Sequence, residues 1–217
     1  MRIVVATRSP HKVEELRRLI AAAGGLPGAQ LCSLAEWEAE TGRAVPEVVE
    51  DRPSFRENAE KKARAVAEAT GAYALADDSG LCVDALGGAP GVHSARYSGV
   101  EGPGRDAANN RRLLEALADV PDGQRGAAFV CALCLAAPDG RTWHAEGRCR
   151  GHIGHAEDGS EGFGYDPLFI SEEPEARGRS HGRLSPEAKD AVSHRGRALR
   201  ALLPTLRQLV ANGERII

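Results

Sequence analysis

The sequence predicts an α/β fold built on a mixed sheet. Strand-like and helix-like segments alternate in the first third of the chain, and a long antiparallel hairpin follows in the middle. Alternation favours parallel strand pairing whereas a hairpin needs antiparallel strands, so one sheet should contain both kinds. The chain has 217 residues, of which 42% are hydrophobic and 27% are charged. This composition supports an ordinary hydrophobic core, and we expect residues 1–217 to form a single domain.

The first strand and the first helix flank a polar turn. Residues 2–6 form a short β-branched run, and residues 11–23 repeat apolar side chains with the spacing of a helix. A stretch rich in Gly and Pro then ends the helix and leads to a weaker strand near Leu31. A second helix is predicted over residues 53–70, where apolar side chains recur on one face and Gly71 ends the segment.

The middle of the chain contains short strands, a helix and a hairpin. Residues 73–76 and 81–83 are predicted as strand pieces on either side of an acidic corner. Residues 106–118 have the pattern of an amphipathic helix. Residues 127–137 and 142–151 flank a Pro-Asp-Gly turn, which is a strong hairpin signal.

The end of the chain is predicted to be helical. Leucines recur on one face of residues 193–210. Pro204 lies inside this segment and should kink the helix, because proline removes a backbone hydrogen bond.

Charge and hydrophobicity argue against several classes of protein. The formal net charge of -3 gives no global positive field of the kind that non-specific nucleic-acid binding uses, so we expect no nucleic-acid partner. No run approaches the ~18 apolar residues of a membrane-spanning helix. The N-terminus enters a strand-like segment directly and lacks the pattern of a signal peptide. We therefore expect a cytoplasmic protein without a membrane partner.

The five cysteines do not indicate a disulfide framework, because their number is odd. Cys131 and Cys134 have C-x-x-C spacing, but they lie in a predicted strand, where residues three apart point to opposite faces. Buried, inert cysteines are therefore favoured over a redox or zinc pair.

A polar turn between the first strand and helix is a candidate phosphate site. A helix N-terminus offers backbone N–H groups and a positive dipole end to an anion, and basic side chains add charge. A simple helix cap with solvated basic residues is the competing interpretation. The turn consists of Thr7, Arg8, Ser9, Pro10, His11 and Lys12.

An acidic pair, Asp77 and Asp78, is followed by Ser79 and a glycine. Carboxylate oxygens at a strand end suit Mg²⁺, which keeps several waters and is completed by substrate phosphates. Asp78 could then polarise an attacking water. A surface turn is the alternative, because all four residue types are common in turns.

Two further segments suggest binding of a nucleobase. Phe163 and Tyr165 lie beside glycines and Asp166, and their rings could stack on a base or pack into the core. Lys189 and the Ser-His-Arg run at 193–195 place donors at the entry to the last helix, where Ser193 is also a good N-cap.

In their order along the chain, these segments resemble the inosine-triphosphate-pyrophosphatase-like family, whose members clear the non-standard purine nucleotides ITP, dITP and XTP. The resemblance runs almost end to end. It includes residues 7–12, SFRENA at 54–59 with Lys62, ADDSGLCVDALGGAPGVHSARYSG at 76–99, GFGYDPLF at 162–169 and SHRG at 193–196.

The resemblance implies a strongly twisted mixed sheet flanked by helices, in two lobes with a central cleft. It also implies a homodimer and a Mg²⁺-dependent hydrolase that releases pyrophosphate from nucleoside triphosphates. Asp78 corresponds to the catalytic base and a metal ligand, and Glu50 to a second metal ligand. The residues implied to bind substrate are Thr7, Arg8, Ser9, Pro10, His11, Lys12, Ser79, Phe163, Gly164, Tyr165, Asp166, Lys189, His194 and Arg195.

Two positions of the phosphate turn depart from the family pattern. Ser9-Pro10 stands where the family usually has Asn, and Arg8 stands where it often has Gly. Arg8 could add a phosphate contact or point outward, and the sequence leaves both open. Two other functions also stay open, namely a nucleotide sensor without activity and a pyrophosphatase for modified pyrimidine nucleotides.

Overall fold

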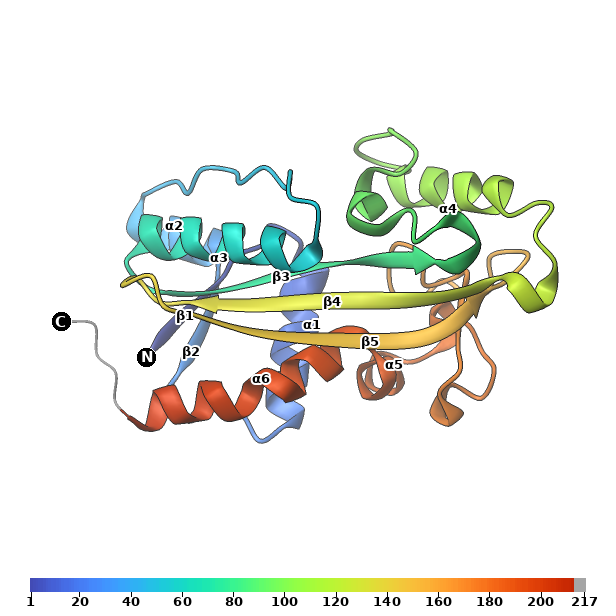
Figure 1. The fold of residues 1–217 in the computed structure, drawn as a ribbon. Coiled ribbons are helices and arrows are strands. Elements are labelled where there is room, and N and C mark those ends of the chain that lie inside the picture. The colour runs from blue at the N-terminus through green and yellow to red at the C-terminus, as the bar shows by residue number, and fades with distance from the viewer. Residues whose placement is uncertain (213–217) are drawn as a thin grey trace. The chain divides into compact units, whose positions relative to one another are not determined.

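The computed structural model describes residues 1–212, within which six strands form one sheet in the order β2-β1-β3-β4-β5-β6 (Figure 1). Strand β1 pairs in parallel with β2 and β3, whereas β5 and β6 are antiparallel, so the predicted mixed sheet is confirmed. The strands are β1 (Arg2–Val5), β2 (Gln30–Ser33), β3 (Tyr73–Val83), β4 (Gly126–Ala136), β5 (Thr142–Ile153) and β6 (Phe169–Ser171). The α-helices are α1 (Pro10–Ala22), α2 (Leu34–Thr41), α3 (Phe55–Thr70), α4 (Arg105–Ala116), α5 (Pro186–Val192) and α6 (His194–Ala211).

The chain divides into two compact units, and the expectation of a single domain stays a prediction. The first unit comprises residues 1–78, 131–147 and the chain from residue 197 on, and the second comprises residues 79–130 and 148–196. Strands β3, β4 and β5 each contribute residues to both units.

The first unit has helices on both faces of its strands (Figure 1). Helices α1 and α6 bury their apolar stripes against one face, and α2 and α3 cover the other. Because strand side chains alternate, Ile3 and Val5 join the first layer while Val4 joins the second. Cys131 and Cys134 are divided between the two layers in the same way, and both are buried, as the sequence predicts.

Helix ends follow the capping residues. Ser33 and Glu36 form a reciprocal capping box at α2, a helix that the sequence analysis did not predict. Helix α3 begins two residues later than expected because Ser54 caps it by accepting from the Glu57 amide. Gly71 ends α3 in the left-handed conformation, with a φ of 66°.

The expectation of two strand pieces separated by an acidic corner was wrong. Strand β3 runs without interruption from Tyr73 to Val83, so Asp77 and Asp78 lie inside it. Both carboxylates are buried, with only 1% and 5% of the respective residues exposed. Their side chains point to opposite faces because they are neighbours in a strand.

The predicted hairpin and final helix are confirmed. Strands β4 and β5 flank the Pro-Asp-Gly turn, and α6 continues through Pro204. None of the helices within residues 1–212 combines the length and apolar character that crossing a bilayer requires.

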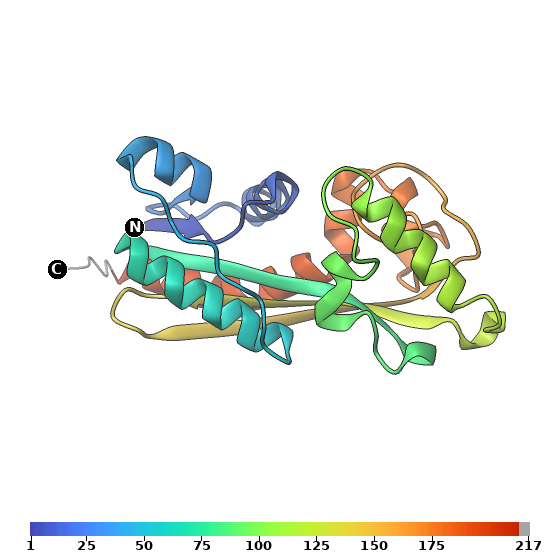
Figure 2. The same cartoon turned by 90° about the horizontal axis from the view of Figure 1, so that it is seen from above.

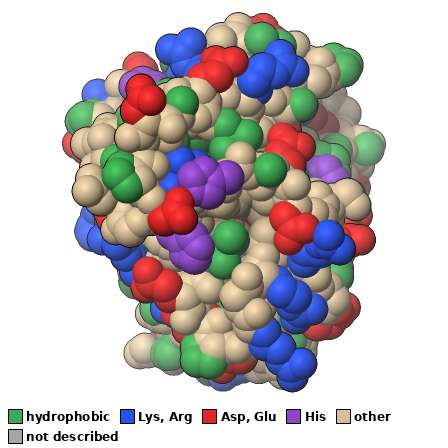
Figure 3. All heavy atoms as spheres, turned by 90° about the vertical axis from the view of Figure 1, so that its right-hand side faces the viewer, with side chains coloured by type: hydrophobic (Ala, Val, Ile, Leu, Met, Phe, Trp, Pro, Cys, Tyr) green, Lys and Arg blue, Asp and Glu red, His purple; other side chains and the backbone are tan. Residues whose placement is uncertain are grey.

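The second unit packs α4 and the loop before β6 onto β3, β4 and β5. Leu113 and Leu117 of this unit belong to the same buried cluster as Leu81 and Phe129. Figure 3 views the right-hand side of Figure 1, where basic, acidic and histidine side chains are interspersed. Charges of both signs are therefore mixed on this face.

A segment with neither helix nor strand, residues 42–54, connects α2 to α3. Figures 1 and 2 show it passing alongside α3 as an extended trace. The segment contains Glu50, which the family resemblance implies is a metal ligand.

Candidate active site

The candidate site residues fall into two groups, one in each unit. The first unit holds Glu50, Asp78 and the turn at 7–12, and the second unit holds the remaining candidates. Along the chain the groups meet at Asp78 and Ser79, which are neighbours in β3.

The turn at 7–12 connects β1 to α1. The Ala6 amide donates to the Leu75 carbonyl at 2.8 Å, which extends the pairing of β1 with β3 up to the turn. Thr7 Oγ1 accepts from the Ser9 amide at 3.1 Å and so orders the turn. Ser9 occupies the N-cap position of α1, yet its hydroxyl makes no capping hydrogen bond, and Pro10 begins the helix. The Ser9 hydroxyl therefore does not stabilise α1 by capping it.

Arg8 binds within the protein. Its guanidinium donates to both carboxylate oxygens of Glu38 on α2, at 3.0 and 2.8 Å, and to the Val45 carbonyl at 2.9 Å. With 51% of its side chain exposed, Arg8 points outward while it binds these groups, and a phosphate contact stays a prediction.

Asp77 is neutralised by its neighbours. Lys12 Nζ lies 2.5 Å from Asp77 Oδ1, and the Cys131 thiol donates to Oδ2 at 3.0 Å. A fully buried carboxylate needs such partners because its water shell is lost. Asp77 therefore fixes Lys12 of the turn to β3.

Asp78 is in a different electrostatic state. Burial raises the pKa of its carboxyl from 3.8 to about 6, although Lys62 acts in the opposite direction. Its Oδ1 lies 3.9 Å from Lys62 Nζ, and its buried Oδ2 has no hydrogen-bond partner among the described residues. A carboxylate oxygen without a partner is costly in a protein, and such groups are frequent where a ligand or ion binds.

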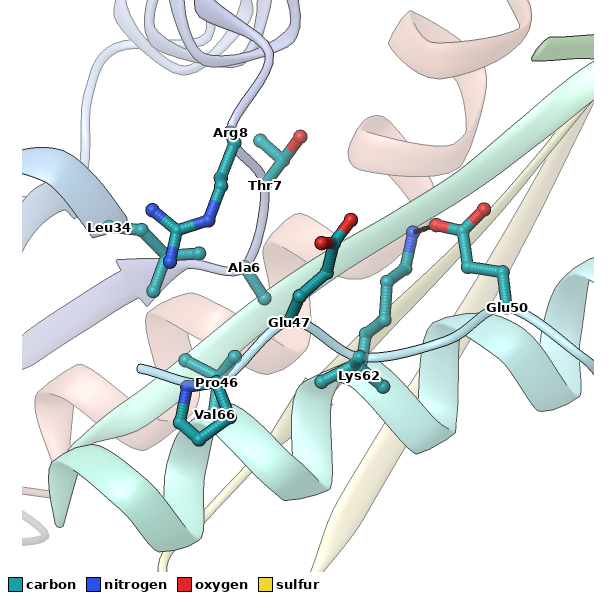
Figure 4. Close-up of a pocket in the computed structure, with 10 residues that line it drawn as sticks. Ala6, Thr7, Arg8, Leu34, Pro46, Glu47, Glu50, Lys62 and Val66 are labelled. Carbon is teal, nitrogen blue, oxygen red and sulfur yellow. Dashed lines mark hydrogen bonds and ion pairs between the residues drawn. The ribbon is translucent and has the colours of Figure 1, made fainter. Parts of the chain in front are cut away.

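Lys62 joins the acidic residues to one another. Its ammonium donates to Glu50 at 2.5 Å and to the Asp77 carbonyl at 2.7 Å. Figure 4 shows Lys62 and Glu50 pointing toward each other at the wall of a cavity of about 130 Å³. Thr7 and Arg8 line the same cavity, so the phosphate turn and the cation–carboxylate pair share one space.

The donor set fits a magnesium ion that is completed by its substrate. Within residues 1–212, no three His, Cys, Asp or Glu side chains come together as a ready-made metal site. Mg²⁺ commonly binds through one or two carboxylates, several waters and substrate phosphates. The unpaired Oδ2 of Asp78, together with Glu50, matches that pattern.

In the second unit, Asp166 organises the predicted base-binding loop. Its Oδ2 accepts from Lys189 Nζ at 2.6 Å and from the Phe163 amide at 2.8 Å. Burial opposes ionisation, but Lys189 and His181 hold the pKa of Asp166 well below its ordinary value. Gly162 packs so closely that an added Cβ would lie 2.2 Å from Asp166 Oδ2. The ionised carboxylate of Asp166 is thus held in place within the GFGYDP segment.

Basic side chains gather around the Phe163 ring. Lys189 Nζ lies 4.6 Å from the ring centroid and the Arg195 guanidinium carbon 5.9 Å from it. Arg195 also donates to the Ser79 hydroxyl at 2.9 Å. The Gly164 amide donates to Asp106 at 2.8 Å, which holds the loop against α4.

Tyr165 and His194 pack inward. Tyr165 is 4% exposed, lies in the core with Phe169 and donates its hydroxyl to the Ser94 carbonyl at 2.8 Å. His194 stacks on Phe129, with ring centroids 4.8 Å apart. Of the two aromatic rings in the segment, only Phe163 is half-exposed, which favours packing over base stacking for Tyr165.

Sequence reasoning gave no role to three residues of these groups. Lys62 follows the SFRENA block at 54–59, and its position on the apolar side of α3 was the available signal. Asp106 and His181 gave no local signal, because their partners Gly164 and Asp166 lie far away in the chain. His181 is fully buried, with Nδ1 3.7 Å from Asp166 Oδ1.

Comparison of the sequence with known proteins shows to which family the chain belongs. The sequence profile of the Ham1 family matches residues 3–205, which is most of the chain. This chain belongs to the Ham1 family. A curated relative, the dITP/XTP pyrophosphatase of Mycobacteroides abscessus, is 49% identical over 216 residues, covering 98% of each chain. The dITP/XTP pyrophosphatase of Streptomyces coelicolor is 47% identical, covering 96% of this chain and 98% of its own.

Solved Ham1 structures have the same fold. The HAM1 protein of Coxiella burnetii superposes with a TM-score of 0.81 at 36% identity, covering 96% of this chain and 99% of its own. These matches confirm the family resemblance and the α/β fold expected from the sequence.

Proposed function

We propose that this Ham1 protein hydrolyses non-standard purine nucleoside triphosphates, ITP, dITP and XTP, to the monophosphate and pyrophosphate with the help of Mg²⁺. The names of its close relatives support the substrate class. The observation that carries the proposal is Asp78, a buried carboxylate with one unpaired oxygen beside a lysine and a phosphate-type turn. Buried acids with raised pKa values are characteristic of catalytic sites.

The first group of residues binds the triphosphate and supplies the base. The hydroxyls of Thr7 and Ser9 donate to phosphate oxygens near the positive end of the α1 dipole. Asp78 and Glu50 would hold Mg²⁺, whose charge polarises phosphate oxygens when it is bound. Asp78, ionised above pH about 6, accepts a proton from the water that attacks the α-phosphorus.

Lys62 keeps this acidic cluster stable before substrate arrives. Its ammonium balances the charge of Glu50 directly. It also lowers the pKa of Asp78, which burial raises. Most of the catalytic effect in phosphoryl transfer comes from such positioning and charge compensation.

The second group recognises the base. Phe163 offers a half-exposed ring for stacking, and stacking contributes ~1–3 kcal/mol per base. Hypoxanthine and xanthine present a 6-oxo acceptor whereas adenine presents a 6-amino donor. A donor from Lys189, His194 or Arg195 aimed at that position would stay unpaired with adenine and so reject it.

A substrate panel tests the proposal. Pyrophosphate release is measured with ITP, dITP, XTP, GTP, ATP and dUTP, with Mg²⁺ and with EDTA. We expect the 6-oxo non-standard nucleotides to exceed ATP in kcat/KM by at least about 100-fold, the scale of an unpaired buried donor, and EDTA to abolish turnover. Equal kcat/KM for ATP and ITP would refute the proposed base selectivity, and unchanged turnover in EDTA would refute the metal requirement.

Asp78→Asn supplies the matched control for this panel. The amide keeps the shape of the side chain but cannot accept the proton, so turnover should be lost while the far-ultraviolet circular dichroism spectrum is unchanged. We further propose a homodimer in solution, which light scattering of the purified chain measures directly.

A further inference from the structure

The irregular segment between α2 and α3, residues 42–54, forms a wall of the candidate phosphate cavity, and we call it the strap. Pro46, Glu47 and Val48 line the cavity together with Glu50 (Figure 4). Since the strap contains no helix or strand, the position of Glu50 depends on side chains from neighbouring elements that bind the strap.

One end of the strap is anchored through Arg8. Glu38 Oε1 accepts from Arg8 at 2.8 Å and from the Val45 amide at 2.8 Å. Arg8 donates in turn to the Val45 carbonyl at 2.9 Å. Both backbone polar groups of Val45, which is 4% exposed, are therefore satisfied by this ion pair.

The other end is anchored by α3. Lys61 donates to the Val49 carbonyl at 2.9 Å and to Asp51 at 2.8 Å, and Lys62 donates to Glu50. Glu50 therefore lies between two sets of anchors, one from the phosphate turn through Arg8 and one from α3.

The positive charge of Arg8 is already balanced by Glu38 in this arrangement. A guanidinium that binds a carboxylate in bidentate fashion has a fixed plane, and a third bond to a carbonyl fixes its position further. Moving it to a phosphate would break three hydrogen bonds and remove the donor to the Val45 carbonyl, which makes a structural role the better explanation.

We propose that Arg8 is a positioning residue that acts through Glu38 and Val45 to hold the Glu50-bearing strap against the phosphate turn, and that it is not a phosphate ligand. The inference rests on the proposed function only for its kinetic consequence. Loss of the anchor should weaken the use of Mg²⁺, because Glu50 is one of its two carboxylate ligands.

Hydrogen exchange of the intact, metal-free chain tests the anchor without any activity measurement. Arg8→Ala and Glu38→Ala should each speed exchange in peptides covering residues 43–49, by about three- to tenfold, the scale of an exposed bidentate pair. Arg17→Ala is the matched control, since Arg17 on α1 pairs with Glu36 on α2, the helix that carries Glu38, and this pair does not include the strap. Wild-type protection in either anchor variant would overturn the proposal.

Kinetics of the double variant separate the two roles of Arg8. If Arg8 acts through Glu38, Arg8→Ala, Glu38→Ala and the double variant should all raise the half-saturating Mg²⁺ concentration by a similar factor of about three to ten. If Arg8 binds phosphate, Arg8→Ala should raise the KM for dITP while Glu38→Ala leaves it unchanged, and this result would overturn the inference. Absence of turnover in the wild type would instead count against the proposed function and leave the exchange result to decide on the anchor.

Discussion

Replacing Asp78 with Asn should stabilise the metal-free protein at alkaline pH more than at acidic pH. Burial raises the pKa of Asp78 from 3.8 to about 6. Ionisation of Asp78 therefore costs more free energy in the folded state than in the unfolded state. Below pH 3.8 both states hold the proton and the penalty vanishes, whereas above pH 6 the penalty is complete. The asparagine variant cannot ionise and escapes the penalty.

The size of this effect follows from the shift. A rise of about two pH units corresponds to about 3 kcal/mol, because each unit is worth about 1.36 kcal/mol. Asp78 is only 5% exposed, so solvent screening reduces this value little. This value already includes the attraction between Asp78 and Lys62, 3.9 Å apart, because Lys62 lowers the pKa of Asp78. About 3 kcal/mol is therefore the upper limit of the stability that the variant gains over the wild type.

Urea unfolding of wild type and Asp78→Asn in EDTA, at pH 4.5 and at pH 8, measures this difference. The stability of the variant relative to wild type should rise between the two pH values. Mg²⁺ added at pH 8 should stabilise the wild type and not the variant, since a ligand stabilises only the folded state that binds it. A relative stability that is constant with pH, or that falls, would refute the assigned state of Asp78.

Three further substitutions test the surrounding residues. Lys62→Gln removes a cation that lowers the pKa of Asp78, so the acid limb of kcat/KM against pH should move to higher pH; an unmoved limb would contradict this coupling. Asp166→Asn leaves the buried Lys189 without its counter-charge and should cost about 3–5 kcal/mol in urea unfolding and raise the KM for dITP. Wild-type values of both would argue against the loop anchor. Tyr165→Phe breaks a hydrogen bond to a buried carbonyl and should cost about 1 kcal/mol with the KM unchanged. A large rise in KM would instead place this ring on the base.

The amphipathic helices and the hairpin could be predicted because their patterns are local. Strand β3 could not, because Asp77 and Asp78 inside it look like a turn in the sequence. Their burial is made tolerable by Lys12 and Lys62, which come from other elements and are distant in sequence. Helix α2 was missed although its Ser33 capping box is a local signal.

The candidate site was predictable in composition but not in its internal contacts. The motifs located Asp78, the phosphate turn and the aromatic segment. Spacing could not show that Arg8 binds Glu38, which lies 30 positions away, because only the fold brings them together. It also could not distinguish the buried Tyr165 from the half-exposed Phe163, because both flank the same glycine.

The central claim is that water attacks the α-phosphorus beside Asp78, and isotope labelling tests it most directly. Hydrolysis of dITP in ¹⁸O-labelled water is followed by mass spectrometry of both products. If water attacks the α-phosphorus, dIMP carries one labelled oxygen and pyrophosphate carries none. Label in pyrophosphate, or formation of dIDP and phosphate, would contradict it.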